Sequence, residues 1–162
     1  MFSNGDIILK YTSRQDTFLF SKTFALKNKW KVNESRLITV ILHDILVYSV
    51  RVNGMYELHL YRGIDHLYLM KLKMQWETND YMEVCSHPSG RVALIRYRYL
   101  RIFDPNGDET FKMYQKESYE SKKIACVGNF ILIMDKVKLS IHNWETKLLR
   151  TIISYNYKHL MM

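Results

Sequence analysis

Cysteine, proline and glycine are all scarce in this chain, with two, two and six copies among 162 residues. So few prolines argue against long ordered loops or linkers between domains. Cys85 and Cys126 each lie inside an apolar stretch, and two isolated cysteines form neither a disulfide framework nor a zinc site. We therefore expect the chain to reside in a reducing compartment, intracellular and cytoplasmic.

Long apolar runs and a targeting segment are missing as well. No run approaches the 18 residues or so that a transmembrane helix requires. Residues 1–10 lack both a basic start and a long apolar centre, so no secretory signal is expected. With 48% apolar and 25% charged residues, the composition is that of a folded soluble protein and excludes a disordered one.

The chain carries a formal net charge of +8, but no run of five like charges. A basic balance can indicate contact with phosphates or with an anionic membrane surface. Because the 24 basic residues are scattered and are interrupted by 16 acids, most of them are expected on solvated strand faces and sheet edges.

Aromatic residues, in contrast, are abundant: twelve tyrosines, seven phenylalanines and three tryptophans. Such residues fit the half-buried surface of a pleated sheet, so their number favours β-strands. The alternative is codon bias in an A/T-rich genome, which would raise lysine, isoleucine and asparagine at the same time.

One pattern occurs three times along the chain: an apolar strand, a short polar connection, and a strand that begins Leu-x-apolar. Its copies are DILVYSVRVNGMYELHLY (44–61), RVALIRYRYLRIF (91–103) and NFILIMDKVKLSIH (129–142). Equivalent leucines are 42 and 39 residues apart, a period typical of stacked four-stranded units. These equivalent leucines are Leu58, Leu100 and Leu139; Leu46, Leu94 and Leu132, at like positions of the preceding strand, are expected to be buried.

Period-two patterning bounded by turn residues divides each repeat into four antiparallel strands. In the second repeat, Pro88-Ser89-Gly90 and Pro105-Asn106-Gly107 supply the backbone angles that tight hairpins require. No segment shows the spacing and caps of a long helix. The predicted strands are 37–42, 45–50, 56–61 and 67–72; 81–86, 91–97, 99–103 and 110–114; and 123–127, 130–134, 137–141 and 148–152.

The two ends break this pattern. Residues 6–24 match only the last two strands of a unit, 6–11 and 17–24, and residues 27–34, rich in lysine and asparagine, are interpreted as a surface loop. The tail, 153–162, has room for one further strand at most. We expect a single domain, 1–162, with a half-unit at 6–24 and complete units at 37–72, 81–114 and 123–152.

The segment CSHPSGRVALIRYRYLRIFDPNGDETFKMY (85–114) resembles a blade of the WD-repeat or NHL-repeat type. VKLSIHNWETKLLRTI (137–152) is similar to the closing half of such a blade. The resemblance implies an all-β fold, a partial β-propeller of about three and a half four-stranded antiparallel blades. Known propellers have at least four blades, so the chain is part of a longer one, its tail completes the first half-blade, or copies self-associate to complete the ring.

The sequence contains no recognisable catalytic or metal-binding pattern. There is no Gly-x-Ser-x-Gly elbow, and no glycine-rich loop precedes a helix. His87 and Ser89 lie in a hairpin turn, and the acids of 104–109 lack the alternation of a calcium loop. We expect no enzymatic activity, no metal and no cofactor. The six histidines are not clustered as a zinc centre would need: His43, His59, His66, His87, His142 and His159.

Basic and aromatic residues alternate in RYRYLR (96–101), which spans the connection between the second and third strands of its repeat. The resemblance implies that such connections lie together on one face, the usual docking face of these propellers. Arginine pairs bidentately with carboxylates and tyrosine offers rigid contact area, a composition typical of binding hot spots. The predicted partner-binding residues are Arg51, Tyr56, Arg96, Tyr97, Arg98 and Lys136.

Three functions fit these residues. The first is a non-enzymatic interaction module or scaffold that docks a protein partner, an acidic segment in particular, on the basic and aromatic face. The second is a nucleic-acid binder that uses the same arginines and tyrosines to contact phosphates and stack on bases. The third, weaker one is an enzyme whose site lies in a part of the ring that this sequence does not contain. The same alternation would also arise in a strand with one solvated face.

Overall fold

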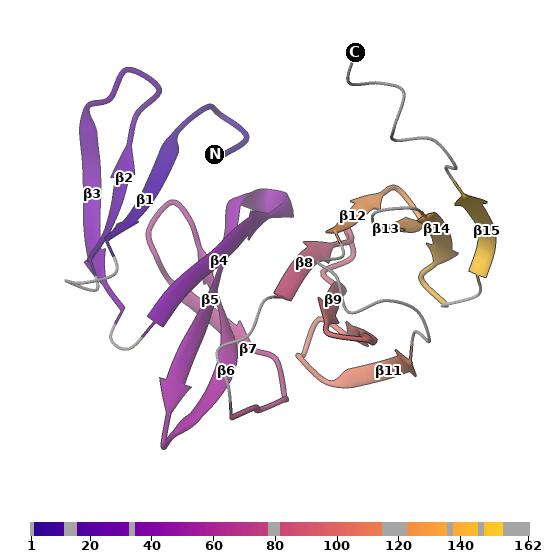
Figure 1. Ribbon diagram of the computed structural model, residues 1–162. Coiled ribbons are helices and arrows are strands. Elements are labelled where there is room, and N and C mark those ends of the chain that lie inside the picture. The colour runs from indigo at the N-terminus through magenta and orange to yellow at the C-terminus, as the bar shows by residue number, and fades with distance from the viewer. Residues whose placement is uncertain are drawn as a thin grey trace, which may run out of the picture. The chain divides into compact units, whose positions relative to one another are not determined.

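The computed structural model describes residues 2–11, 16–32, 35–77, 82–114, 123–135, 138–145 and 148–153 (Figure 1). Within these ranges the chain forms four antiparallel sheets, in each of which every strand pairs with the next one along the sequence. This succession of hairpin-connected sheets confirms the predicted fold class, an all-β partial β-propeller. In the described residues, no helix is long and apolar enough to cross a membrane.

Three of the sheets have four strands, and their bounds follow the predicted repeats closely. A 3₁₀ turn, Leu42–Asp44, connects the first two strands of the second sheet. The second sheet contains β4 (Ser35–Ile41), β5 (Ile45–Val52), β6 (Met55–Arg62) and β7 (Tyr68–Lys71); the third β8 (Met82–Ser86), β9 (Val92–Arg96), β10 (Tyr99–Phe103) and β11 (Glu109–Tyr114); the fourth β12 (Lys123–Val127), β13 (Phe130–Met134), β14 (Lys138–Asn143) and β15 (Leu148–Ile153).

The first sheet corrects the prediction at the N-terminal end. It has three strands, not two: β1 (Ile7–Tyr11), β2 (Asp16–Phe20) and β3 (Leu26–Lys31). The segment interpreted as a surface loop, 27–34, therefore contributes most of β3. Its lysines suit an edge strand, and Trp30 supplies the apolar side chain that packs on the core.

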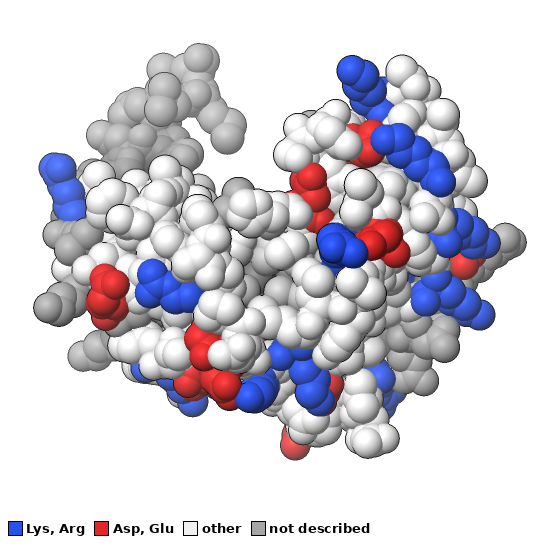
Figure 2. All heavy atoms as spheres, turned by 180° about the vertical axis from the view of Figure 1, so that it is seen from behind, with Lys and Arg blue, Asp and Glu red and all other residues white. Residues whose placement is uncertain are grey.

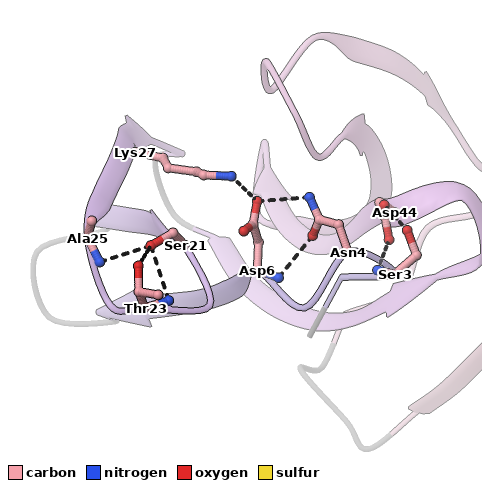
Figure 3. A network of polar contacts seen from close by, with 8 residues as sticks. All are labelled: Ser3, Asn4, Asp6, Ser21, Thr23, Ala25, Lys27 and Asp44. Atoms are coloured by element: carbon pink, nitrogen blue, oxygen red, sulfur yellow. Dashed lines mark hydrogen bonds and ion pairs between the residues drawn. The ribbon is translucent and has the colours of Figure 1, made fainter.

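Polar contacts fix the ends of this first sheet (Figure 3). Lys27 Nζ donates to Asp6 Oδ2 at 2.6 Å, which ties β3 to the segment before β1. Asn4 Nδ2 donates to the same carboxylate at 3.0 Å. Ser3 donates to Asp44 through both its backbone N–H and its hydroxyl, each at 2.6 Å. The start of the chain is thereby held against the 3₁₀ turn between β4 and β5.

By its contacts the chain divides into two compact units, Met1–Asp80 with Asn106–Asp108, and Tyr81–Pro105 with Glu109–Met162. The first contains β1–β7 and the second β8–β15. In the first unit a core of buried apolar side chains lies between the first two sheets. It contains Phe2, Leu19, Val32, Leu46, Tyr48 and Val50. The prediction of a single domain over residues 1–162 stays a prediction.

The core of the second unit lies between the third and fourth sheets. Ala93, Ile95 and Leu100 come from the third sheet, and Ile131 and Ile133 from the fourth, all at most 3% exposed. One side of each sheet therefore supplies the core, as period-two alternation requires. The opposite side of the third sheet carries buried Val92, Leu94 and Phe103 as well as basic and aromatic residues.

A disulfide joins Cys85 in β8 to Cys126 in β12, with Cα atoms 5.6 Å apart. The expectation that these cysteines form no disulfide is wrong, because the two lie 41 residues apart, about one repeat, on the first strands of consecutive sheets. Stacking of the repeats brings such equivalent positions together. The inference of a reducing compartment rested on the absence of a disulfide, and it is no longer supported, since disulfides persist in oxidising surroundings.

The predicted burial of the repeated leucines holds at two positions of three. Leu46 and Leu94 are fully buried, whereas Leu132 is only partly buried. In β13 the buried residues are its neighbours, Ile131 and Ile133. The alignment was therefore wrong by one residue at this strand, and a one-residue shift moves a side chain to the other face of the sheet.

Candidate interaction surface

Cationic and aromatic residues gather on part of one side of the third sheet, around the β9–β10 turn and along β10 and β11. In the register of β9, β10 and β11, Arg96 and Tyr114 both pair with Tyr99, while Lys112 pairs with Arg101. Paired residues lie on the same side of an antiparallel sheet. We call this set, with the turn residues Tyr97 and Arg98, the basic-aromatic ladder: Arg96, Tyr97, Arg98, Tyr99, Arg101, Lys112 and Tyr114.

A tight turn and alternation bring these residues together. Tyr97 and Arg98 form the two-residue turn between β9 and β10, and Tyr97 adopts a positive φ of 51°. This left-handed conformation suits the tight hairpin. Leu100 and Ile102, which alternate with the ladder residues of β10, point to the core of the second unit. Tyr99 and Arg101 therefore point to the other side of the sheet, which is exposed only around the ladder, because Leu94 and Phe103 on that same side are buried.

Each exposed ring of the ladder has a cation beside it. The Arg96 guanidinium carbon lies 4.9 Å from the Tyr97 ring centroid. Arg98 lies 5.9 Å from the Tyr114 centroid and donates to its hydroxyl at 2.6 Å. Such cation–π contacts contribute on the order of 0.5–1 kcal/mol each at exposed sites. The side chains are therefore partly ordered before any partner arrives.

Tyr99 joins the two ends of the ladder. Lys112 Nζ is 4.6 Å and the Arg101 guanidinium carbon 5.8 Å from the Tyr99 ring centroid. The Tyr99 and Tyr114 rings meet edge to face, with centroids 5.5 Å apart. One acid lies next to this group, Glu109, which accepts a hydrogen bond from Arg101. The surface consequently combines a positive charge excess with accessible rings; Tyr97 is 61% and Tyr114 52% exposed.

The structure brings three of the predicted binding residues together and separates others from them. Arg96, Tyr97 and Arg98 are contiguous members of the ladder. Arg51 and Tyr56 pair with each other across the β5–β6 hairpin of the first unit. That they share one face with the ladder involves both units and stays a prediction, and Lys136 lies outside the described residues.

Tyr56, one of the predicted binding residues, packs on a residue outside the predicted site. Its ring stacks on Trp76 with centroids 6.5 Å apart, and the two residues exchange backbone hydrogen bonds of 2.7 and 3.1 Å. Conversely, Lys112 and Tyr114 are not among the predicted binding residues. The alternation of residues in β11 indicates that Lys112 and Tyr114 share one side of the strand. Only the register of β11 with β10 shows that this is the side of the sheet on which Tyr99 and Arg101 lie.

A second polar cluster lies in the first unit around Glu57, whose side chain is 3% exposed. Its carboxylate is bonded to His59 Nε2 at 2.9 Å, Lys71 Nζ at 3.1 Å and Gln75 Nε2 at 2.5 Å. Burial alone would raise the pKa of Glu57, yet hydrogen bonds from His59, Gln75 and Lys71 together lower it to about 2. The hydrogen-bonding capacity of this carboxylate is thus used within the fold, where it connects β6, β7 and the following segment.

A third cluster surrounds His66, whose imidazole is stacked between Trp30 and Tyr61 at centroid distances of 4.8 and 4.5 Å. Because the Tyr48 hydroxyl donates to Thr17, His66 Nε2–H donates to the Tyr48 oxygen at 3.2 Å. Burial, aided by the charge of Lys10, lowers the pKa of His66 to about 4. Burial likewise raises the pKa of Tyr48 to about 12.

Acidification is therefore expected to destabilise the first unit in two successive windows. The unfolded chain protonates His66 near pH 6.5 and the folded chain only near 4, so stability falls between these values as pH decreases. Because the ring is only half-buried, screening limits this loss to about 1–2 kcal/mol. Stability contributed by Glu57 is present above pH 4.5 and is lost toward pH 2.

Urea unfolding of the protein and of His66→Asn at several pH values tests the first window. The variant is expected to flatten the decline between pH 6.5 and 4, whatever its absolute stability. His43→Asn is the matched control, because His43 also has a positive φ, 61°, but is exposed. An unchanged slope in His66→Asn would contradict the assignment.

Charges elsewhere are mixed. Figure 2 shows lysine and arginine side chains interspersed with acids on one face of the molecule. In the described part of the chain, no group of three or more histidine, cysteine, aspartate or glutamate residues is arranged to hold a metal ion. The ladder thus combines cations with accessible aromatic rings, and this composition suits an anionic partner.

No protein-family model and no curated protein sequence matches the chain. Solved structures do match. Hsv2 of Kluyvelomyces marxianus is 10% identical with a TM-score of 0.71, over 94% of this chain and 57% of that one. Apo AztD from Citrobacter koseri is 13% identical with a TM-score of 0.65, over 96% of this chain and 46% of that one.

BBS1N, solved in complex with ARL6DN, is 11% identical with a TM-score of 0.61, over 93% of this chain and 50% of that one. At such identities the likeness concerns the fold alone. The chain spans about half the length of these solved structures.

Proposed function

We propose that the chain is a non-catalytic protein-interaction module, a degenerate relative of WD-repeat and NHL-repeat propellers, that docks an acidic partner segment on the basic-aromatic ladder. The observation that carries the proposal is the set of exposed tyrosine rings flanked by ordered cations around the β9–β10 turn and β11 of the third sheet. The occurrence of a similar fold in the BBS1N–ARL6DN complex supports it as a precedent for a bound protein.

The composition of the ladder explains why an acidic segment is favoured. Arginine can pair with a carboxylate through two parallel hydrogen bonds, and tyrosine loses little conformational entropy when it is covered. Charge would accelerate encounter, while the rings and guanidinium groups would retain the bound segment. Because Arg98 is already bonded to Tyr114, part of the ordering cost precedes binding.

The double charge reversal Arg96→Glu/Arg98→Glu tests this assignment. Binding of a fluorescent peptide of alternating glutamate and leucine, followed by anisotropy, is expected to weaken by about 30-fold, which is about 2 kcal/mol. The melting temperature should change little, since exposed charges contribute little to stability.

Lys22→Glu/Arg36→Glu is the matched control, because it makes the same change of net charge at two exposed positions outside the ladder. Its affinity for the peptide should remain close to that of the unaltered protein. Equal losses in both double variants would show that net charge alone attracts the peptide, and an unchanged Arg96→Glu/Arg98→Glu would show that the ladder does not bind it.

A nucleic-acid partner is the second candidate, because accessible tyrosine rings beside arginines could stack on bases while the cations contact phosphates. Salt dependence separates the two. A single-stranded oligothymidylate bound through many phosphates would lose affinity linearly with log salt at a slope of about −0.7 per contact. Oligothymidylate binding stronger than peptide binding, with that slope, would favour the second candidate.

A further inference from the structure

The fourth sheet has one apolar side that does not belong to the core of the second unit. Ile124, Ile131 and Ile133 point into that core. The residues that alternate with them are paired across β12, β13, β14 and β15 and so share the other side. We call the apolar residues of this side the C-terminal face: Ala125, Val127, Phe130, Leu132, Met134, Leu139, Ile141 and Ile152. Lys123, Asn143 and Arg150 lie on the same side.

The C-terminal face is accessible to an unusual extent for so many large apolar side chains. Val127 is 56%, Phe130 45%, Met134 48% and Ile152 43% exposed. This exposure differs from the burial of the equivalent positions in the other two repeats. Leu58 and Leu100 are fully buried, whereas the equivalent Leu139 is not. A contiguous exposed apolar patch usually marks a surface that another element covers.

The first sheet has a corresponding apolar side. Ile8, Leu19 and Trp30 point to the core of the first unit. On the opposite side, Ile7 and Leu26 both pair with Phe20, and Leu9 pairs with Phe18. Leu9 is 55% and Leu26 56% exposed. We call the apolar residues of this side the N-terminal face: Ile7, Leu9, Phe18, Phe20 and Leu26. Asp16, Lys29 and Lys31 lie on the same side.

We propose that two copies of this chain associate, each placing its C-terminal face on the N-terminal face of the other. The occupant is a second copy because the two faces are both apolar sheet surfaces of the type that already pack on each other inside each unit. The chain also spans only 46–57% of the lengths of the solved structures that it matches, so two copies together have about the length of one such structure.

A reciprocal arrangement of this kind is closed: both copies use both faces, and no unpaired face is left to recruit a third copy. The ladder takes no part in it, because its residues lie on the opposite side of the third sheet from the core that the third and fourth sheets share. The proposed association can therefore be tested independently of the proposed binding of an acidic segment.

Sedimentation velocity with single glutamate substitutions tests the proposal. The unaltered protein is expected to be a dimer at micromolar concentration, and Leu9→Glu and Phe130→Glu should each weaken the dimer by at least about tenfold. Ile64→Glu is the matched control, because Ile64 is 75% exposed but lies in the turn between β6 and β7, outside both faces. It should remain dimeric. Far-UV circular dichroism checks that each variant is folded.

Mixing the two variants distinguishes this arrangement from self-pairing of one face. A mixture of Leu9→Glu and Phe130→Glu retains one unaltered contact and should regain dimers that neither variant forms alone. Loss of the dimer in only one of the two variants, loss in Ile64→Glu, no recovery on mixing, or a monomeric unaltered protein would each overturn the proposal. If a glutamate variant fails to fold, Leu26→Gln and Val127→Thr make the same comparison with milder changes.

Discussion

Removing the disulfide between Cys85 and Cys126 is expected to lower the free energy of unfolding by about 4 kcal/mol. The bond closes a loop of 41 residues, and a cross-link of this span restricts the unfolded chain by about that amount in the chain-entropy description. Cys85 belongs to the apolar core of the second unit and Cys126 packs against it, so the bond also fixes β8 against β12 beside that core.

Urea unfolding of the oxidised protein, of Cys85→Ala and of Cys85→Ala/Cys126→Ala measures the effect. The single and double variants should be destabilised to a similar extent, because either change removes the cross-link. Dithiothreitol is the control for lost packing: it should destabilise the unaltered protein and leave the double variant unchanged. Two free thiols found by mass spectrometry after unfolding without reductant would contradict the prediction.

Truncating the repeated leucine is expected to have unequal effects in two consecutive sheets. Leu100 is fully buried in the core of the second unit, so Leu100→Ala should cost about 2–5 kcal/mol through lost apolar burial and the cavity that remains. Leu139 occupies the equivalent position on the C-terminal face and is partly accessible. Leu139→Ala should cost less than about 1 kcal/mol in dilute solution, where copies are dissociated.

Urea unfolding at nanomolar and at micromolar protein concentration measures both variants. The cost of Leu139→Ala is expected to rise with concentration, because association covers the face, while that of Leu100→Ala should not. Equal costs at the lower concentration would show that the two leucines are equally buried and that the fourth sheet is not open on this side.

Most of the strand pattern could be predicted because turns and alternation are local properties. Gly90 has a φ of 84°, and its N–H donates to His87 O at 2.9 Å, as the Pro-x-Gly signal predicts. Gly107, at the end of Pro105-Asn106-Gly107, likewise has a positive φ of 80°. Such positions mark hairpins in the sequence whatever packs against them.

Pairing across sheets could not be predicted in the same way. The disulfide depends on how consecutive repeats stack. The packing of β3 depends on the stacking of Trp30 on His66, which lies 36 positions further along the chain. Likewise, the part of the ladder that β11 contributes follows from its register with β10, which the alternation of residues alone does not fix. The site was thus predicted at its turn and missed at its neighbouring strand.

The lysines of β3 affect how copies of this protein can aggregate through the edge of the first sheet. β3 is an edge strand of the first sheet, and Lys27, Lys29 and Lys31 occupy every second position along it. A strand added to this edge would lie about 5 Å away, so in-register stacking of identical copies would force like charges together. A bulge where β2 meets β3 further distorts the edge. Fibril growth along this edge is thereby opposed, although the adjoining apolar side of the same sheet remains accessible.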